Sequence, residues 1–111
     1  MMITTHVLDL ASGSPARGVS VKLEVERTGG WMAVGEGVTD ENGRLAALAD
    51  GAQSAPGTYR LTFDLARYHR EHGLEAFFPD ATVTFNVRDA SGRYHVPLLI
   101  SPFGYSTYRG S

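Results

Sequence analysis

Two histidines lie in apolar, strand-like stretches of this 111-residue sequence: His6 in TTHVLD and His95 in YHVPLLI. Imidazole exchanges protons near neutral pH, so such a pair could serve as general base and general acid. The same pattern also fits two inert histidines that are hydrogen-bonded at a subunit interface, because perturbed histidines are often structural. The residues alone leave both interpretations open.

An arginine and the last four residues are further candidates. Arg44 ends the segment TDENGR, and a guanidinium can bind a carbonyl or an anionic edge of a ligand. The Asp-Glu-Asn-Gly run before it is also good hairpin-turn chemistry, after which an arginine could simply be solvated. The strand-like run SPFGYSTY leads with almost no spacer into the final residues, which predicts that they occupy a specific place instead of fraying. These residues are Tyr108, Arg109, Gly110 and Ser111.

The remaining titratable clusters favour no metal site. His69 and His72 are three residues apart on a short predicted helix, near one helical face, but no third ligand is spaced for a metal. Both are therefore expected to be solvated surface histidines. The acidic TDENG run lacks the continuation of a calcium loop, since Gly51 stands where an EF-hand needs its closing glutamate. We predict no metal and no cofactor.

Period-two alternation of apolar and polar residues dominates the sequence and predicts strands. VSVKLEVE, TYRLTFDL and ATVTFNVR each have one apolar and one polar face, and turn signals such as RTGG, SAPG and DASGR separate the strands. One short helix is predicted in LARYHREHG, residues 65–73, with Asp64 as its N-cap and Gly73 as its stop. The pattern predicts an all-β sandwich that forms a single domain over residues 1–111.

The two stretches that contain the candidate histidines differ from this pattern because both of their faces are largely apolar. His6 shares its face with Leu8, and His95 shares its face with Leu99. One face of each strand must serve the core, and a two-sheet sandwich of this size cannot cover the other. We therefore expect an oligomer interface on the outer face of the sheet that holds both strands. Pro97 cannot donate to a β-ladder, so it indicates an edge position or a local break in pairing.

Composition excludes several classes of protein. The net charge of -2 argues against a generic nucleic-acid binder and against a polybasic membrane-surface module. No apolar run approaches the length of a membrane span, and the first ten residues lack the pattern of a secretion signal. The absence of cysteine excludes disulfides, thiolate metal sites and a cysteine nucleophile. A cytoplasmic location is the default expectation.

Four segments occur in order along nearly the whole chain: TTHVLD, TDENGR, FFPDATVTF and YHVPLLISPFGYSTYRGS. Together they resemble the transthyretin-related 5-hydroxyisourate hydrolases, whose signature is the terminal tetrapeptide YRGS. Transthyretin itself, the hormone carrier, shares the fold but lacks this tetrapeptide and the two histidines. The resemblance implies a transthyretin-like two-sheet β-sandwich of about eight strands with one short helix. It also implies a homotetramer, a dimer of dimers, with a central channel.

The resemblance further implies a site at the dimer–dimer interface and a reaction. The reaction is hydrolysis of 5-hydroxyisourate to 2-oxo-4-hydroxy-4-carboxy-5-ureidoimidazoline in urate degradation, a part of purine metabolism. His6 and His95 would activate water and relay a proton. Arg44 would stabilise the oxyanion, and Ser111 would position water or substrate. The substrate-binding tail would be completed by Tyr108, Arg109 and Gly110.

Two other functions compete with this one. A transthyretin-like carrier would bind a small aromatic ligand in the tetramer channel without chemistry, and it would need an apolar channel with few titratable groups. A β-sandwich adhesion or carbohydrate-binding module would most often be secreted and joined to other domains. The fold by itself does not separate these functions, whereas the signature residues favour the hydrolase.

Overall fold

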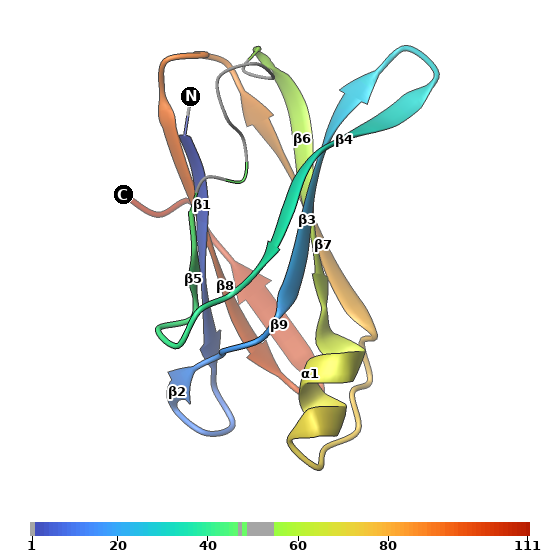
Figure 1. The fold of residues 1–111 in the computed structure, drawn as a ribbon, viewed down its shortest axis with the longest axis vertical. Helices are drawn as coiled ribbons and strands as arrows, with labels where there is room; N and C mark the ends of the chain where they lie inside the picture. Colours follow the sequence, from blue (N-terminus) through green and yellow to red (C-terminus); the bar gives the residue numbers. More distant parts are fainter. Residues whose placement is uncertain (1, 47, 49–54) are drawn as a thin grey trace.

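Two β-sheets pack face to face in the structure, a computed structural model that describes residues 2–46, 48 and 55–111 (Figure 1). One sheet has the strand order β2-β1-β8-β9, and β5 also pairs with β1; the other has the order β4-β3-β6-β7. The predicted all-β sandwich with one short helix is confirmed. In chain order the elements are β1 (Met2–Asp9), β2 (Ser14–Pro15), β3 (Ser20–Arg27), β4 (Gly30–Val38), β5 (Arg44–Leu45), β6 (Gly57–Asp64), α1 (Leu65–Glu71), β7 (Asp80–Val87), β8 (Arg93–Ser101) and β9 (Gly104–Thr107).

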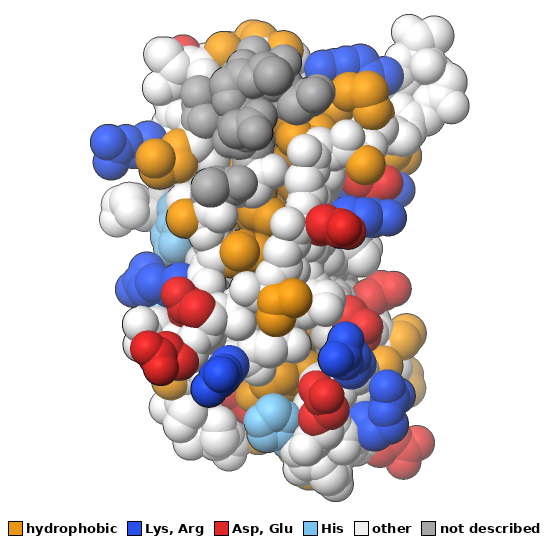
Figure 2. All heavy atoms as spheres, viewed as in Figure 1, with side chains coloured by type: hydrophobic (Ala, Val, Ile, Leu, Met, Phe, Trp, Pro, Cys, Tyr) orange, Lys and Arg blue, Asp and Glu red, His pale blue; other side chains and the backbone are white. Residues whose placement is uncertain are grey.

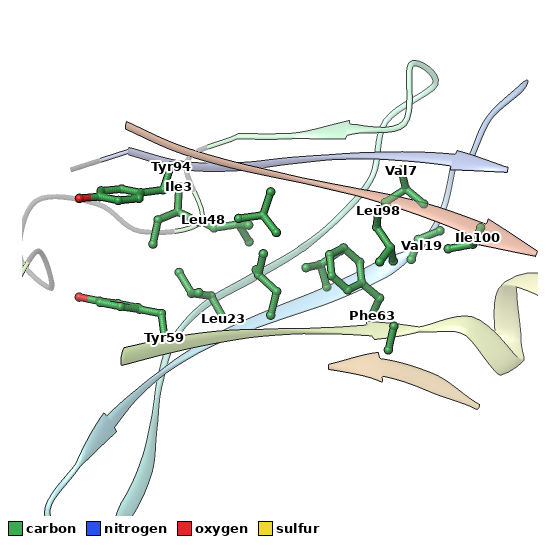
Figure 3. Close-up of a cluster of buried hydrophobic side chains, with 14 of the residues drawn as sticks. Ile3, Val7, Val19, Leu23, Leu48, Tyr59, Phe63, Tyr94, Leu98 and Ile100 are labelled. Atoms are coloured by element: carbon green, nitrogen blue, oxygen red, sulfur yellow. The ribbon is translucent and has the colours of Figure 1, made fainter. Parts of the chain in front are cut away.

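The core lies between the sheets and follows the predicted alternation. Side chains of both sheets point toward one another in Figure 3, with Ile3 and Leu98 on one side and Tyr59 and Phe63 on the other. Each fully buried side chain of this kind stabilises the fold by about 1.5–3 kcal/mol relative to an exposed one. Of the predicted inward residues of β7, Ala81 and Val87 are buried, while Val83 and Phe85 are only half-buried because β7 is the last strand of its sheet.

The strand β4 is not predicted from the sequence. Its residues do not alternate cleanly, and its pairing with β3 contains a bulge between Leu23 and Glu24. Gly35 belongs to this strand, and a Cβ there would collide with the backbone carbonyl of Leu48. The glycine is thus required by the close approach of another backbone segment, which is a tertiary cause that no local pattern reveals.

The TDENGR segment forms a turn, but this turn does not join two neighbouring strands of one hairpin. Its flanking strands, β4 and β5, belong to different sheets, so this turn carries the chain from one layer of the sandwich to the other. Turn-forming residues specify only the local reversal of the backbone, and they do not determine which strand the following residues join.

The helix α1 begins and ends close to where the sequence predicts. The Asp64 carboxylate accepts a hydrogen bond from the backbone N–H of Arg67, and Gly73 has a φ of +73° just after the helix. His72 is exposed, as predicted, but His69 is not a surface residue. Its side chain is fully buried, and neither ring nitrogen has a hydrogen-bond partner among the described residues. The helix packs on the sandwich with the face that carries this histidine.

The surface in Figure 2 carries side chains of both charges interspersed, in agreement with the small net charge. Within the described part of the chain, no helix has the length and apolar character needed to cross a membrane.

Candidate functional site

Strand pairing brings the candidate residues together on the outer face of one sheet. The parallel register of β1 and β8 places Thr4 beside His95, and the antiparallel pair of β1 and β5 places Arg44 beside His6. Paired residues in neighbouring strands project from the same face of a sheet. The side chains on the opposite face of β1, such as Ile3, are buried in the core, so the two histidines and Arg44 face outward. This confirms the orientation predicted from the alternation.

The turn before β5 positions Arg44. The Asp40 carboxylate accepts hydrogen bonds from the backbone N–H groups of Asn42 and Arg44, at 2.8 and 3.0 Å. These two bonds lower the pKa of Asp40 below its ordinary value, and the charges of Arg44 and His6 lower it by a smaller amount. Gly43 has a φ of +74°, and its carbonyl accepts a 2.7 Å hydrogen bond from the N–H of Val7. The turn is thereby tied directly to β1.

Two neighbours constrain His95. Its Nδ1 lies 2.7 Å from the hydroxyl oxygen of Thr4, and its carbonyl accepts a 2.8 Å hydrogen bond from the N–H of Gly110. A Cβ on Gly110 would lie only 2.5 Å from Cδ2 of the ring, so the glycine backbone lies directly against the imidazole. Partial burial lowers the pKa of His95, and the charges of Arg44 and His6 lower it further. The ring therefore favours its neutral form.

The last residues of the sequence continue the ladder beside β8. The last pair of the β8–β9 ladder is Leu98 with Thr107. Further along, His95 of β8 forms an isolated bridge with Gly110. Pro97 lies between these two points. The sequence predicts either an edge position or a local break in pairing at this proline. Because β8 is an interior strand, the local break is the correct alternative. The prediction that the tail occupies a specific place is also confirmed at Gly110.

A pocket of about 250 Å³ opens where these elements meet. Thr4, Arg44, His95 and Ser111 line it, with Met2, Arg93 and Gly110 completing the wall. The guanidinium groups of Arg44 and Arg93 make it suited to a carbonyl-rich or anionic ligand. His6 does not line this pocket, but it lies directly beside Arg44 in the register of the sheet.

The other two tail residues lie at a different cavity. Tyr108 and Arg109 line a space of about 230 Å³ between β7 and β8, and His95 lines both cavities. Arg109 donates to the carbonyl of Arg93 at 3.4 Å, and its guanidinium lies 5.0 Å from the ring centre of Tyr94. These contacts anchor the tail on the side of β8 that faces away from the pocket with Arg44.

Thr4 and Arg93 are residues that the sequence did not indicate. Nothing local singles them out, because their place in the pocket depends on the parallel pairing of two strands about ninety residues apart. Among residues 2–46, 48 and 55–111, no group of three or more His, Cys, Asp or Glu side chains is arranged to hold a metal ion.

Comparison with known proteins agrees with this architecture. The model of the HIUase/Transthyretin family matches residues 3–110. The chain is 44% identical to the 5-hydroxyisourate hydrolase of Salmonella dublin over 110 residues, which cover 99% of this chain and 81% of the relative. The structure of Klebsiella pneumoniae 5-hydroxyisourate hydrolase is 36% identical, with a TM-score of 0.84 and full coverage of both chains. Transthyretin from Sparus aurata is 34% identical, with a TM-score of 0.92 and coverage of 97% of this chain and 95% of that one. The chain belongs to the HIUase/Transthyretin family.

Proposed function

We propose that this protein hydrolyses 5-hydroxyisourate to 2-oxo-4-hydroxy-4-carboxy-5-ureidoimidazoline in urate degradation. The observation that carries the proposal is the grouping of His6, Arg44 and His95 with the last residues of the sequence on one outer sheet face. Relatives named 5-hydroxyisourate hydrolase, at 44% identity over nearly the whole chain, supply the substrate.

The chemistry requires a base, an acid and a site for negative charge. The two histidines, His6 and His95, take a proton from water and deliver one to the ring nitrogen that leaves. The hydroxide adds to the carbonyl carbon and the C–N bond breaks. The electron pair of that bond stays on the leaving nitrogen, which takes up the delivered proton. A neutral His95 ring is suited to proton transfer because its free nitrogen can act as an acceptor or a donor.

The remaining residues bind and orient the substrate in this proposal. Arg44 stabilises the developing oxyanion, a role in which one well-placed donor is worth about 10²–10³ in turnover. Ser111 lines the same pocket and positions water or substrate. The tail is held in place by Tyr108, Arg109 and Gly110, of which the last two have contacts to the β8 backbone. The reaction as proposed uses no metal and no cofactor.

We further propose that the active form is a cytoplasmic homotetramer, a dimer of dimers. The outer face of β1 and β8 carries half-buried apolar side chains, Leu8 and Leu99, beside the histidines. A second copy of the chain would cover this face and remove the pocket from bulk water, which strengthens every electrostatic contact in it.

A transthyretin-like carrier is the second candidate, favoured by the TM-score of 0.92 to Sparus aurata transthyretin. A carrier site is expected to be mostly apolar. The pocket beside His95 instead has two arginines and a serine in its wall, and this polarity supports the hydrolase.

The deciding experiment follows the decay of freshly made 5-hydroxyisourate by ultraviolet absorbance, with substrate generated from urate and uricase. The intact protein is compared with H6A, H95A and a variant that lacks residues 109–111. The exposed helix variant R67Q serves as a control. Acceleration by the intact protein and by R67Q, together with its loss in the other variants at unchanged oligomeric state, supports the proposal. If the substrate decays only at the spontaneous rate in the presence of the intact protein, the hydrolase function is excluded and ligand binding becomes the function to measure.

A further inference from the structure

We propose that Thr4 is a positioning residue for His95, holding the imidazole so that its Nε2 is the atom that exchanges protons with the substrate. The inference rests on the proposed function for its catalytic meaning. Its structural part, the coupling of the hydroxyl to the ring, can be tested without any substrate.

Two contacts on different edges of the ring hold His95 in one orientation. The Thr4 hydroxyl oxygen lies 2.7 Å from Nδ1, and the Gly110 backbone lies against the edge formed by Cγ and Cδ2. Nε2 makes no hydrogen bond to any other described residue. A half-turn flip of the ring about χ2 would exchange Nδ1 with Cδ2, so it would break the first contact and turn Nδ1 toward Gly110. The geometry therefore assigns the structural role to Nδ1 and leaves Nε2 available for a ligand.

A hydroxyl at this place differs from the usual partner of a catalytic histidine. A carboxylate or a carbonyl can only accept a hydrogen bond, so it holds the proton on Nδ1. The Thr4 hydroxyl can accept from a protonated Nδ1 or donate to an unprotonated one. Either neutral tautomer is then hydrogen-bonded, and Nε2 can carry a lone pair or a proton while the ring stays in place.

The contact also suits a reaction that both removes and delivers a proton. When Nε2 of the Nδ1–H tautomer takes a proton from water, the ring becomes an imidazolium, and delivery of that proton to the leaving nitrogen restores the neutral ring. The Thr4 oxygen accepts from Nδ1–H at each stage and keeps the imidazole in place. A carboxylate in place of the hydroxyl would also stabilise the imidazolium. The hydroxyl adds no charge and leaves the neutral form favoured beside Arg44.

The test compares T4V, T4S and the intact protein. Valine has the shape of threonine and keeps its preference for strands, but it lacks the hydroxyl, whereas serine restores the hydroxyl. The matched control is T82V, the same substitution at an exposed position of β7 in the other sheet. Ring ¹⁵N spectra report the tautomer of His95, and steady-state kinetics report kcat and KM separately.

The proposal expects a specific pattern. In T4V, the His95 ring ¹⁵N signals move, and kcat falls by about 10- to 100-fold with a smaller change in KM, as follows from loss of orientation. T4S regains most of the loss, and T82V matches the intact protein. If T4V retains both the ring signals and kcat, or if T4S behaves like T4V, the positioning role is wrong.

The outcome can be separated from that of the hydrolase proposal. If the intact protein does not hydrolyse 5-hydroxyisourate, the proposed function fails, while the ¹⁵N comparison of T4V with the intact protein still decides whether Thr4 controls the ring. If the intact protein is active and T4V leaves the ring spectrum and kcat unchanged, Thr4 is excluded and the hydrolase proposal stands.

Discussion

Gly110 lies against the imidazole of His95 so closely that a Cβ on the glycine would come within 2.5 Å of Cδ2. The two residues also form an isolated bridge, in which the N–H of Gly110 donates to the carbonyl of His95 at 2.8 Å. Because the glycine has no side chain, the backbone of the last residues can lie beside the ring without displacing the ring. The absence of a side chain at this position has a direct consequence for the proposed catalysis.

Replacing Gly110 with alanine should displace either the tail or the ring. We expect G110A to lower kcat/KM by about tenfold or more, because small misplacements of a catalytic group are costly. Kinetic assays and the melting temperature check this. The control is G104A, where a Cβ would meet its nearest neighbour only at 3.9 Å. Equal activity of G110A and the intact protein would show that the close contact does not matter.

Arg44 is expected to depress the pKa of His95 as well as to bind substrate. In R44Q, the pKa of His95 should rise toward its ordinary value, because a positive neighbour is removed while partial burial, the larger cause, remains. NMR titration of the ring measures this shift. Turnover should fall by about 10²-fold or more if Arg44 also stabilises the oxyanion. An unchanged titration in R44Q, with R67Q as reference, would contradict the electrostatic coupling.

The lowered pKa of His95 also makes stability depend on pH. Between the folded value and the ordinary value of 6.5, the unfolded chain binds more protons than the folded one at this residue. The free energy of unfolding should therefore decline as the pH falls below the ordinary value. Urea unfolding at a series of pH values measures the slope. H95N should show a shallower decline, and an identical slope in both proteins would argue against the shift.

Tyr68 joins the helix to the first strand through a buried hydrogen bond. Its hydroxyl donates to the Asp9 carboxylate at 2.8 Å, and this carboxylate also accepts from the backbone N–H of Ala11. Y68F leaves the buried carboxylate without one donor and should lower the free energy of unfolding by about 1–3 kcal/mol. Urea denaturation tests this, with the exposed Tyr105→Phe as the control. A loss no larger in Y68F than in the control would count against the bond.

His69 presents the opposite case, a buried polar ring without hydrogen-bond partners in the described part of the protein. H69L has a similar volume and no polar atoms to leave unpaired, so it should raise the free energy of unfolding by about 1 kcal/mol. H72L is the comparison, because the exposed His72 ring is hydrogen-bonded to the Tyr68 carbonyl and should give no gain. Destabilisation by H69L would indicate that the ring has a partner.

Local patterns in the sequence were sufficient for much of the fold. Alternation identified the inward residues of β1, β3, β6 and β8, because a half-buried strand must place one kind of side chain on each face. Capping residues located α1, since Asp64 and Gly73 satisfy local backbone requirements. Neither inference needs knowledge of any distant residue.

The errors have tertiary causes. β4 is not predicted, and the turn residues of TDENGR do not indicate which sheet the next strand joins, because partners in a sheet are chosen by global packing and not by the turn itself. His69 was placed on the surface, although three-residue spacing on a helix does not specify which side of the helix is covered.

By itself, then, the sequence determined the residue types of the site and the outward direction of His6 and His95, because alternation is a local property of each strand. Only the tertiary structure decided their neighbours. The parallel pairing of β1 with β8 placed Thr4 at Nδ1 of His95, the short pair with β5 placed Arg44 at His6, and the resumed ladder placed Gly110 against the ring. The register between strands distant in the chain arises from packing of the whole core, so no local pattern can encode it.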